Sequence, residues 1–173
     1  MSLFDTTTTG NISLGTLLTT GDINLHNSGQ SGLVHVKGDT ETTSTTTGAL
    51  ILDGGLGVAK SLSLGEKLNM VGKGTVTQTT SATTGVTLNA PAGIITTVSQ
   101  ALVSNASATF SVTNSYSLND SLILTTVIAY SGTSTITVET NQIGAGPGSF
   151  DVKITNVGGG TLDAVAKIGF LIV

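Results

Sequence analysis

The chain has 173 residues, of which only 9% are charged, and its six lysines and ten acidic residues give a formal net charge of −4. A surface without arginine and with so little positive charge is poorly suited to a phosphate backbone, so we expect no nucleic-acid partner. The chain has no cysteine, which excludes disulfides, thiolate metal ligands and cysteine catalysis, and no apolar run long enough to predict a signal peptide or membrane insertion.

Threonine and glycine dominate the composition, with 32 and 23 residues. The branched Cβ of threonine fits a pleated surface and crowds a helix, so this excess favours extended chain. The apolar fraction is 38% and the mean hydropathy is +0.35, which is not the composition of a disordered chain. The composition therefore predicts an all-β protein.

Residues 1–73 carry a short repeated phrase, which predicts an N-terminal anchor and shaft. "TTGNISL" (8–14), "TTGDINL" (19–25) and "TTGALIL" (46–52) each place apolar residues two and four positions after a glycine, as a turn followed by a one-faced strand would. One chain of such strands cannot enclose a core, but copies intertwined around a common axis can. The predicted interface residues of this intertwined β shaft are Leu50, Leu52, Leu56, Val58, Leu62, Leu64, Leu68 and Met70.

Within this region, "GGLGVAKS" (54–61) comes within one residue of a phosphate-binding loop, which leaves a nucleotide-binding enzyme as a distant alternative. Ala59 stands where that loop needs glycine, and a side chain there would crowd the turn that presents N–H groups to phosphate. The loop also needs a helix after it, whereas "SLSLGEKLNM" alternates in the manner of a strand. We therefore expect a turn of the shaft, no cofactor and no enzymatic activity.

Residues 74–173 change to longer strands at regular spacing, which predicts an antiparallel, jelly-roll-like β-sandwich head. Residues 122–130 are apolar or Thr on both faces, as in a central strand, and the final apolar strand is expected in an interface or inside a sheet. The predicted strands are 75–80, 85–90, 93–99, 107–113, 121–130, 134–140, 149–157 and 164–173.

"TTTGALILDGGLGVAKSLSLGEKLNM" (45–70) resembles the repeat TTTGAL-x-x-x-GGLGV-x-x-x-L-x-x-G of bacteriophage fibre proteins and related viral fibres. "GTVTQTTSATTGVTLNAPAGIITT" (74–97) and "GSFDVKITNVGGGTLDAVAKIGFLIV" (148–173) are similar to a head domain that follows such shafts. The resemblance covers about residues 40–173 and brings no catalytic residues. It implies a homotrimer on the virion surface, attached to other capsid or tail proteins through its N-terminal region.

Two roles on a virion fit this resemblance. A short fibre would serve host attachment by binding a host-surface glycan or protein. Only about forty residues precede the matching repeat, fewer than the anchor of long tail fibres, so a capsid-decorating protein that stabilises the viral shell is the alternative. Candidate receptor contacts lie in loops 114–120, 130–134 and 141–149, where rings and amides suit carbohydrate: Tyr116, Asn119, Tyr130, Asn141 and Gln142.

Other titratable residues give weaker signals. Asp39 and Glu41 lie in a polar turn, "GDTETT", and we expect a solvated loop there instead of an acid/base pair. His26 and His35 are expected to be surface or interface side chains. A threefold axis would bring three copies of one histidine together, which is enough for a divalent ion, but no metal site is predicted from the pattern itself.

Overall fold

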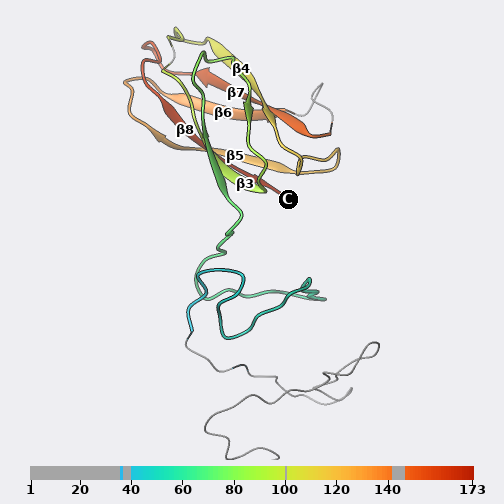
Figure 1. The fold of residues 1–173 in the computed structure, drawn as a ribbon. Helices are drawn as coiled ribbons and strands as arrows, with labels where there is room; N and C mark the ends of the chain where they lie inside the picture. Colours follow the sequence, from blue (N-terminus) through green and yellow to red (C-terminus); the bar gives the residue numbers. More distant parts are fainter. Residues whose placement is uncertain (1–35, 37–39, 100, 142–146) are drawn as a thin grey trace, which may run out of the picture. The chain divides into compact units, whose positions relative to one another are not determined.

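The computed structural model describes residues 36, 40–99, 101–141 and 147–173 (Figure 1). The chain divides into two compact units, residues 1–58 and 59–173. Within the described residues all regular structure is β and no helix occurs. The all-β prediction is therefore confirmed.

All eight strands predicted between residues 74 and 173 are present, and most bounds differ by one to three residues. β4 has the predicted bounds, because its strict alternation of polar and apolar residues begins and ends beside turn residues. The strands are β1 (Gly74–Thr77), β2 (Val86–Thr87), β3 (Ala92–Thr96), β4 (Ser107–Thr113), β5 (Ile123–Tyr130), β6 (Ile136–Asn141), β7 (Ser149–Asn156) and β8 (Ala166–Ile172).

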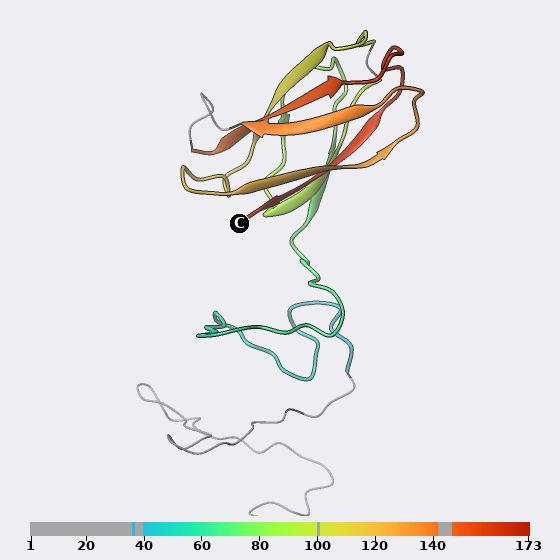
Figure 2. The same cartoon turned by 180° about the vertical axis from the view of Figure 1, so that it is seen from behind.

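The strands form two four-stranded sheets, which pack as the layers of a β-sandwich (Figure 1). Sheet A has the order β1-β3-β8-β5 and sheet B the order β2-β4-β7-β6. Figure 2 shows the sandwich from behind, with the orange strands β6 and β7 side by side in one layer. Successive strands from β1 to β6 alternate between the two sheets, so the predicted β-sandwich is confirmed.

Both sheets are mixed, which corrects the prediction of wholly antiparallel pairing. The β3–β8, β5–β8, β4–β7 and β6–β7 pairs are antiparallel, but β1–β3 and β2–β4 are parallel. The reason lies in the alternation between sheets. Because β2 lies in the opposite sheet, the chain reverses twice between β1 and β3 and returns to sheet A in its original direction.

The core lies between the sheets and is built from alternate residues of each strand. The inward side chains of β4 and β7 are almost fully buried, and their outward neighbours are hydroxylated or charged, as predicted for one-faced strands. The Phe150 and Phe170 rings meet edge to face across the core, with centroids 5.4 Å apart. The central cluster is Ile95, Phe110, Val112, Ile123, Phe150, Val152, Ile154, Ile168 and Phe170.

The prediction that residues 122–130 are buried on both faces is wrong. β5 is an edge strand of sheet A, and its outward residues Leu124 and Ile128 are 51% and 50% exposed. The apolar final strand, β8, does lie inside its sheet, between β3 and β5. The outer face of sheet A is therefore open in the single chain, although β5 carries apolar residues on it.

The described part of the predicted shaft, residues 40–73, contains no strand. A shaft whose strands pair between copies has no partner in one chain, so its intertwined form stays a prediction. The predicted interface side chains are open to solvent, with Met70 partly buried and the other seven exposed by 45–70%: Leu50, Leu52, Leu56, Val58, Leu62, Leu64 and Leu68.

Candidate contact site at the distal end of the sandwich

The strand directions give the sandwich two distinct ends. β1 begins at Gly74, directly after Lys73, and Gly74 pairs with Gly93 of β3, which pairs with Phe170 of β8. We call the end where the chain enters β1 the proximal end; it also holds loop 114–122. The opposite, distal end holds residues 101–106, 131–135 and 157–165.

Two of the predicted contact residues lie at the proximal end. Tyr116 and Asn119 are exposed in the loop between β4 and β5. This loop is tied down by Asn114, which is fully buried and donates from Nδ2 to the Ala90 carbonyl oxygen at 2.8 Å. Gly148 donates to the Ser117 carbonyl oxygen at 2.7 Å. The loop is thus fixed beside the point at which the chain enters the sandwich.

Tyr130 lies at the distal end, together with a residue that sequence reasoning missed, Asp163. Asp163 Oδ1 accepts hydrogen bonds from the Tyr130 hydroxyl at 3.4 Å and from the Thr133 backbone N–H at 3.3 Å. The turn can close over the ring because residue 132 is glycine, and a Cβ there would collide with the Tyr130 hydroxyl. These bonds are long and exposed to solvent, so each is weak.

A buried asparagine holds the distal loops in place. Asn156, at the end of β7, donates from Nδ2 to the carbonyl oxygens of Leu102 at 2.8 Å and Gly160 at 2.7 Å. Its Oδ1 accepts from Ser134 Oγ at 2.5 Å and from the Gly158 N–H at 3.1 Å. One side chain with all its hydrogen-bonding groups satisfied therefore joins three loops. Tyr130, Thr133 and Asp163, which we call the distal cluster, lie on or beside these loops.

A small hollow of about 180 Å³ lies beside the cluster, lined by Ala129, Tyr130, Ser131, Val165 and Lys167. Pockets for whole small molecules are usually about 300–1,000 Å³, so this one is suited to a single group of a larger partner. Its surface is almost entirely apolar, and the hydroxyl of the Tyr130 ring on its wall is hydrogen-bonded to the Asp163 carboxylate. A ring with an apolar face and a polar edge suits the apolar face of a sugar or an apolar group of a peptide.

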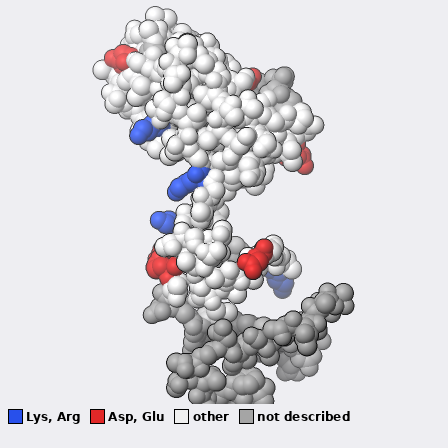
Figure 3. Space-filling model, in the orientation of Figure 1, with Lys and Arg blue, Asp and Glu red and all other residues white. Residues whose placement is uncertain are grey.

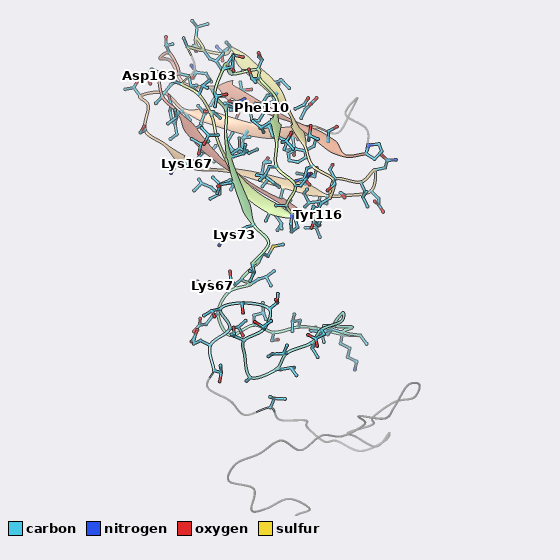
Figure 4. The ribbon with its side chains drawn as sticks, in the orientation of Figure 1. Lys67, Lys73, Phe110, Tyr116, Asp163 and Lys167 are labelled. Carbon is cyan, nitrogen blue, oxygen red and sulfur yellow. The ribbon has the colours of Figure 1, made fainter. Side chains whose placement is uncertain are left out.

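The structure therefore separates the predicted contact residues. Figure 4 shows Tyr116 and Lys73 toward one end of the sandwich and Asp163 at the other. Asn141 ends β6 on the Tyr116 side, where it pairs with Asp151, and Gln142 lies outside the described residues. Among the four of these residues that the structure describes, Tyr130 alone belongs to the distal cluster.

The other chemical interpretations gain no support among the described residues. Residues 54–61 form neither strand nor helix, and no helix follows Ser61 as a phosphate-binding loop would need. Within the same described set no group of three or more His, Cys, Asp or Glu could hold a metal ion. Glu41 is exposed, while His26, His35 and Asp39 lie outside the described residues.

Comparison with protein-family models, with curated proteins and with solved structures found no match to this chain. No helix in the described part of the chain has the length and apolar character to cross a membrane.

Proposed function

We propose that the protein is a non-enzymatic, homotrimeric fibre on the surface of a virion, which presents the distal end of its sandwich to a host-surface glycan or protein. The observation that carries this proposal is the difference between the two ends of the sandwich. The chain enters the sandwich beside Gly74, whereas Tyr130, Thr133 and Asp163 cluster at the opposite end. A domain carried on a shaft meets its receptor with the end that faces away from that shaft.

Homotrimerisation is supported by the apolar side chains before the sandwich. Leu56, Leu62 and Leu68 are exposed by 63%, 61% and 70%, and burying a leucine side chain contributes roughly 1.5–3 kcal/mol. Monomeric soluble proteins rarely expose so many large apolar side chains along one stretch. Copies wound around a shared axis would bury them without any other partner. The N-terminal region would then attach the trimer to other capsid or tail proteins.

A matched pair of tyrosines tests the attachment role. In virus particles that carry this protein, Tyr130→Ala is expected to reduce adsorption to host cells at least about tenfold, as loss of an aromatic contact at a binding hot spot does. Tyr116→Ala, at the proximal end, is the control and is expected to leave adsorption unchanged. Equal melting temperatures of the purified variants would show that both fold.

Two other outcomes would reject this assignment. If Tyr116→Ala abolishes adsorption and Tyr130→Ala does not, the contact surface is the proximal end. If neither variant changes adsorption, and particles that lack the protein adsorb normally but lose infectivity at a lower temperature, the protein stabilises the shell. The second result would select the capsid-decorating role, which requires the same trimer and the same fold.

A further inference from the structure

The two outer faces of the sandwich differ in chemistry. The outer face of sheet B is polar: Ser107 Oγ bonds Thr155 Oγ1 at 2.9 Å, and Lys153 Nζ lies 3.4 Å from Glu139 Oε2. The outer face of sheet A instead carries a patch of apolar side chains, which we call the apolar face. Its members are Ala92, Ile94, Leu124, Ile128 and Leu171.

The apolar face is shaped as well as hydrophobic. A β-bulge between Val127 and Ala129 shifts the register of β5 against β8, and bulges re-aim side chains in this way. Ile128 then lies over Gly169, where a Cβ would fall 2.7 Å from the Ile128 Cδ1 atom. Next to it, an apolar hollow of about 470 Å³ extends across β1, β3, β8 and β5.

The distribution of charged residues indicates that this face suits an apolar partner. Lys167 is the one charged residue in the four strands of sheet A, which the structure describes in full, and Lys73 lies just before β1. These two lysines lie away from each other along the sheet (Figure 4). Figure 3 shows a surface with few charged side chains on the visible side of the sandwich. Lys73 lines one end of the apolar hollow, and between the two lysines the strands of sheet A offer a charged partner no further complementary group.

The size of the face points to another copy of the chain as the occupant. The four strands have four, five, eight and seven residues; with strands about 4.8 Å apart and about 3.3 Å per residue, they cover roughly 380 Å². A stable interface between free proteins needs about 800 Å² per partner. The face is therefore too small to hold a separate protein firmly. Copies already joined elsewhere contact each other at high effective concentration, and for them a weak apolar contact is enough.

We infer that the apolar face of sheet A is the surface through which the sandwiches of neighbouring copies contact one another. The inference depends on the proposed shaft, which joins the copies, but it names a separate surface. In the assembly Leu124, Ile128 and Ile94 would face the same residues of the other copies around the axis. The polar face of sheet B and the distal cluster would stay in solvent.

Single-cysteine cross-linking tests this contact, because the chain has no cysteine of its own. Thr126→Cys places a thiol on the apolar face, and Thr109→Cys places one on the outer face of sheet B; both threonines are exposed. In the full-length protein, a short bismaleimide is expected to join Thr126→Cys into covalent dimers and trimers and to leave Thr109→Cys uncoupled. Maleimide should also label Thr126→Cys on the order of tenfold more slowly than Thr109→Cys, because the contact between copies must open before the Thr126→Cys thiol can react.

A second variant checks that the apolar side chains cause the contact. Adding Leu124→Lys to Thr126→Cys is expected to abolish the cross-link and restore fast labelling, while the shaft keeps the protein trimeric. If the protein is a trimer but the two thiols behave alike, this inference is wrong and the proposed assembly stands. If the protein is a monomer, the proposed assembly fails; slow labelling of Thr126→Cys in that monomer would show that the chain covers its own apolar face.

Discussion

Replacement of Phe150 by alanine is expected to lower the free energy of unfolding of the sandwich by about 3–5 kcal/mol. Phe150 is fully buried and meets the Phe170 ring from sheet A at a centroid distance of 5.4 Å. The ring therefore joins the two layers, and its loss leaves a cavity that neither sheet can fill without moving. Chemical denaturation followed by circular dichroism measures the change.

Tyr116→Ala is the control for this experiment. Tyr116 is 52% exposed in the proximal loop, and exposed substitutions usually change stability by less than about 0.5 kcal/mol. Equal unfolding midpoints for the two variants would mean that the sheets do not depend on Phe150 for their packing. The sandwich would then have a different core from the one described.

Asn156→Asp is expected to destabilise the sandwich by about 3 kcal/mol, although it changes the volume of the side chain very little. The variant keeps an oxygen for Ser134 and Gly158, but it replaces the amide that donates to the Leu102 and Gly160 carbonyl oxygens. The Leu102 oxygen keeps the Leu162 N–H at 2.8 Å and the Gly160 oxygen keeps the Ser134 hydroxyl at 3.2 Å, but both then face a buried carboxylate that has no proton to donate to them. Loss of hydrogen-bond partners at a buried, charged group costs about 1–3 kcal/mol or more. Thermal melting at neutral pH measures the loss.

The matched control is Asn119→Asp, because Asn119 is exposed in the proximal loop. This substitution is expected to leave the melting temperature nearly unchanged. If Asn156→Asp melted together with Asn119→Asp, the distal loops would not depend on the Asn156 amide. The proposed attachment role further predicts that virus particles with a folded but loosened Asn156→Asp protein adsorb poorly, because Tyr130 and Asp163 lie on or beside the loops that Asn156 joins.

The sandwich could be predicted from sequence because its strands alternate cleanly. In β4 and β7 each buried residue is followed by a hydroxylated or charged one, and this period of two identifies both the strand and its inner face. β5 departs from this rule. Apolar residues on both faces of a strand predict that both faces are buried. The pattern does not show whether another part of the same chain or another copy of the chain buries the outer face.

The contact site was harder to predict, because the positions of loops along the chain say nothing of strand direction. Loops 114–122 and 131–135 are separated by one strand, β5, and therefore lie at opposite ends of the sandwich. Counting the strands between loops is enough to separate Tyr116 from Tyr130 by sequence alone. Asp163 was not predictable in this way, since its approach to Tyr130 depends on the close turn at Gly132. Only the folded chain shows that contact.

The different chemistry of the ends and faces of the sandwich connects these observations to the proposed role. Residues before β1 expose leucines that one chain cannot bury, sheet A presents an apolar face, and the polar distal cluster lies away from the end where the chain enters. The assembly proposed above, with copies around an axis and their distal ends outward, would account for all three features. The two apolar features would be unusual in a monomer, because monomeric soluble proteins rarely expose apolar surface on this scale.

The mass of the full-length protein in solution tests the trimeric assembly most directly. Light scattering or sedimentation equilibrium at micromolar concentration is expected to return three times the 17.2 kDa of one chain, and to do so without a change on tenfold dilution. Leu56→Asp combined with Leu62→Asp should lower that mass, because buried unpaired carboxylates oppose the shaft contact. A mass of 17.2 kDa for the unaltered protein would contradict the assembly.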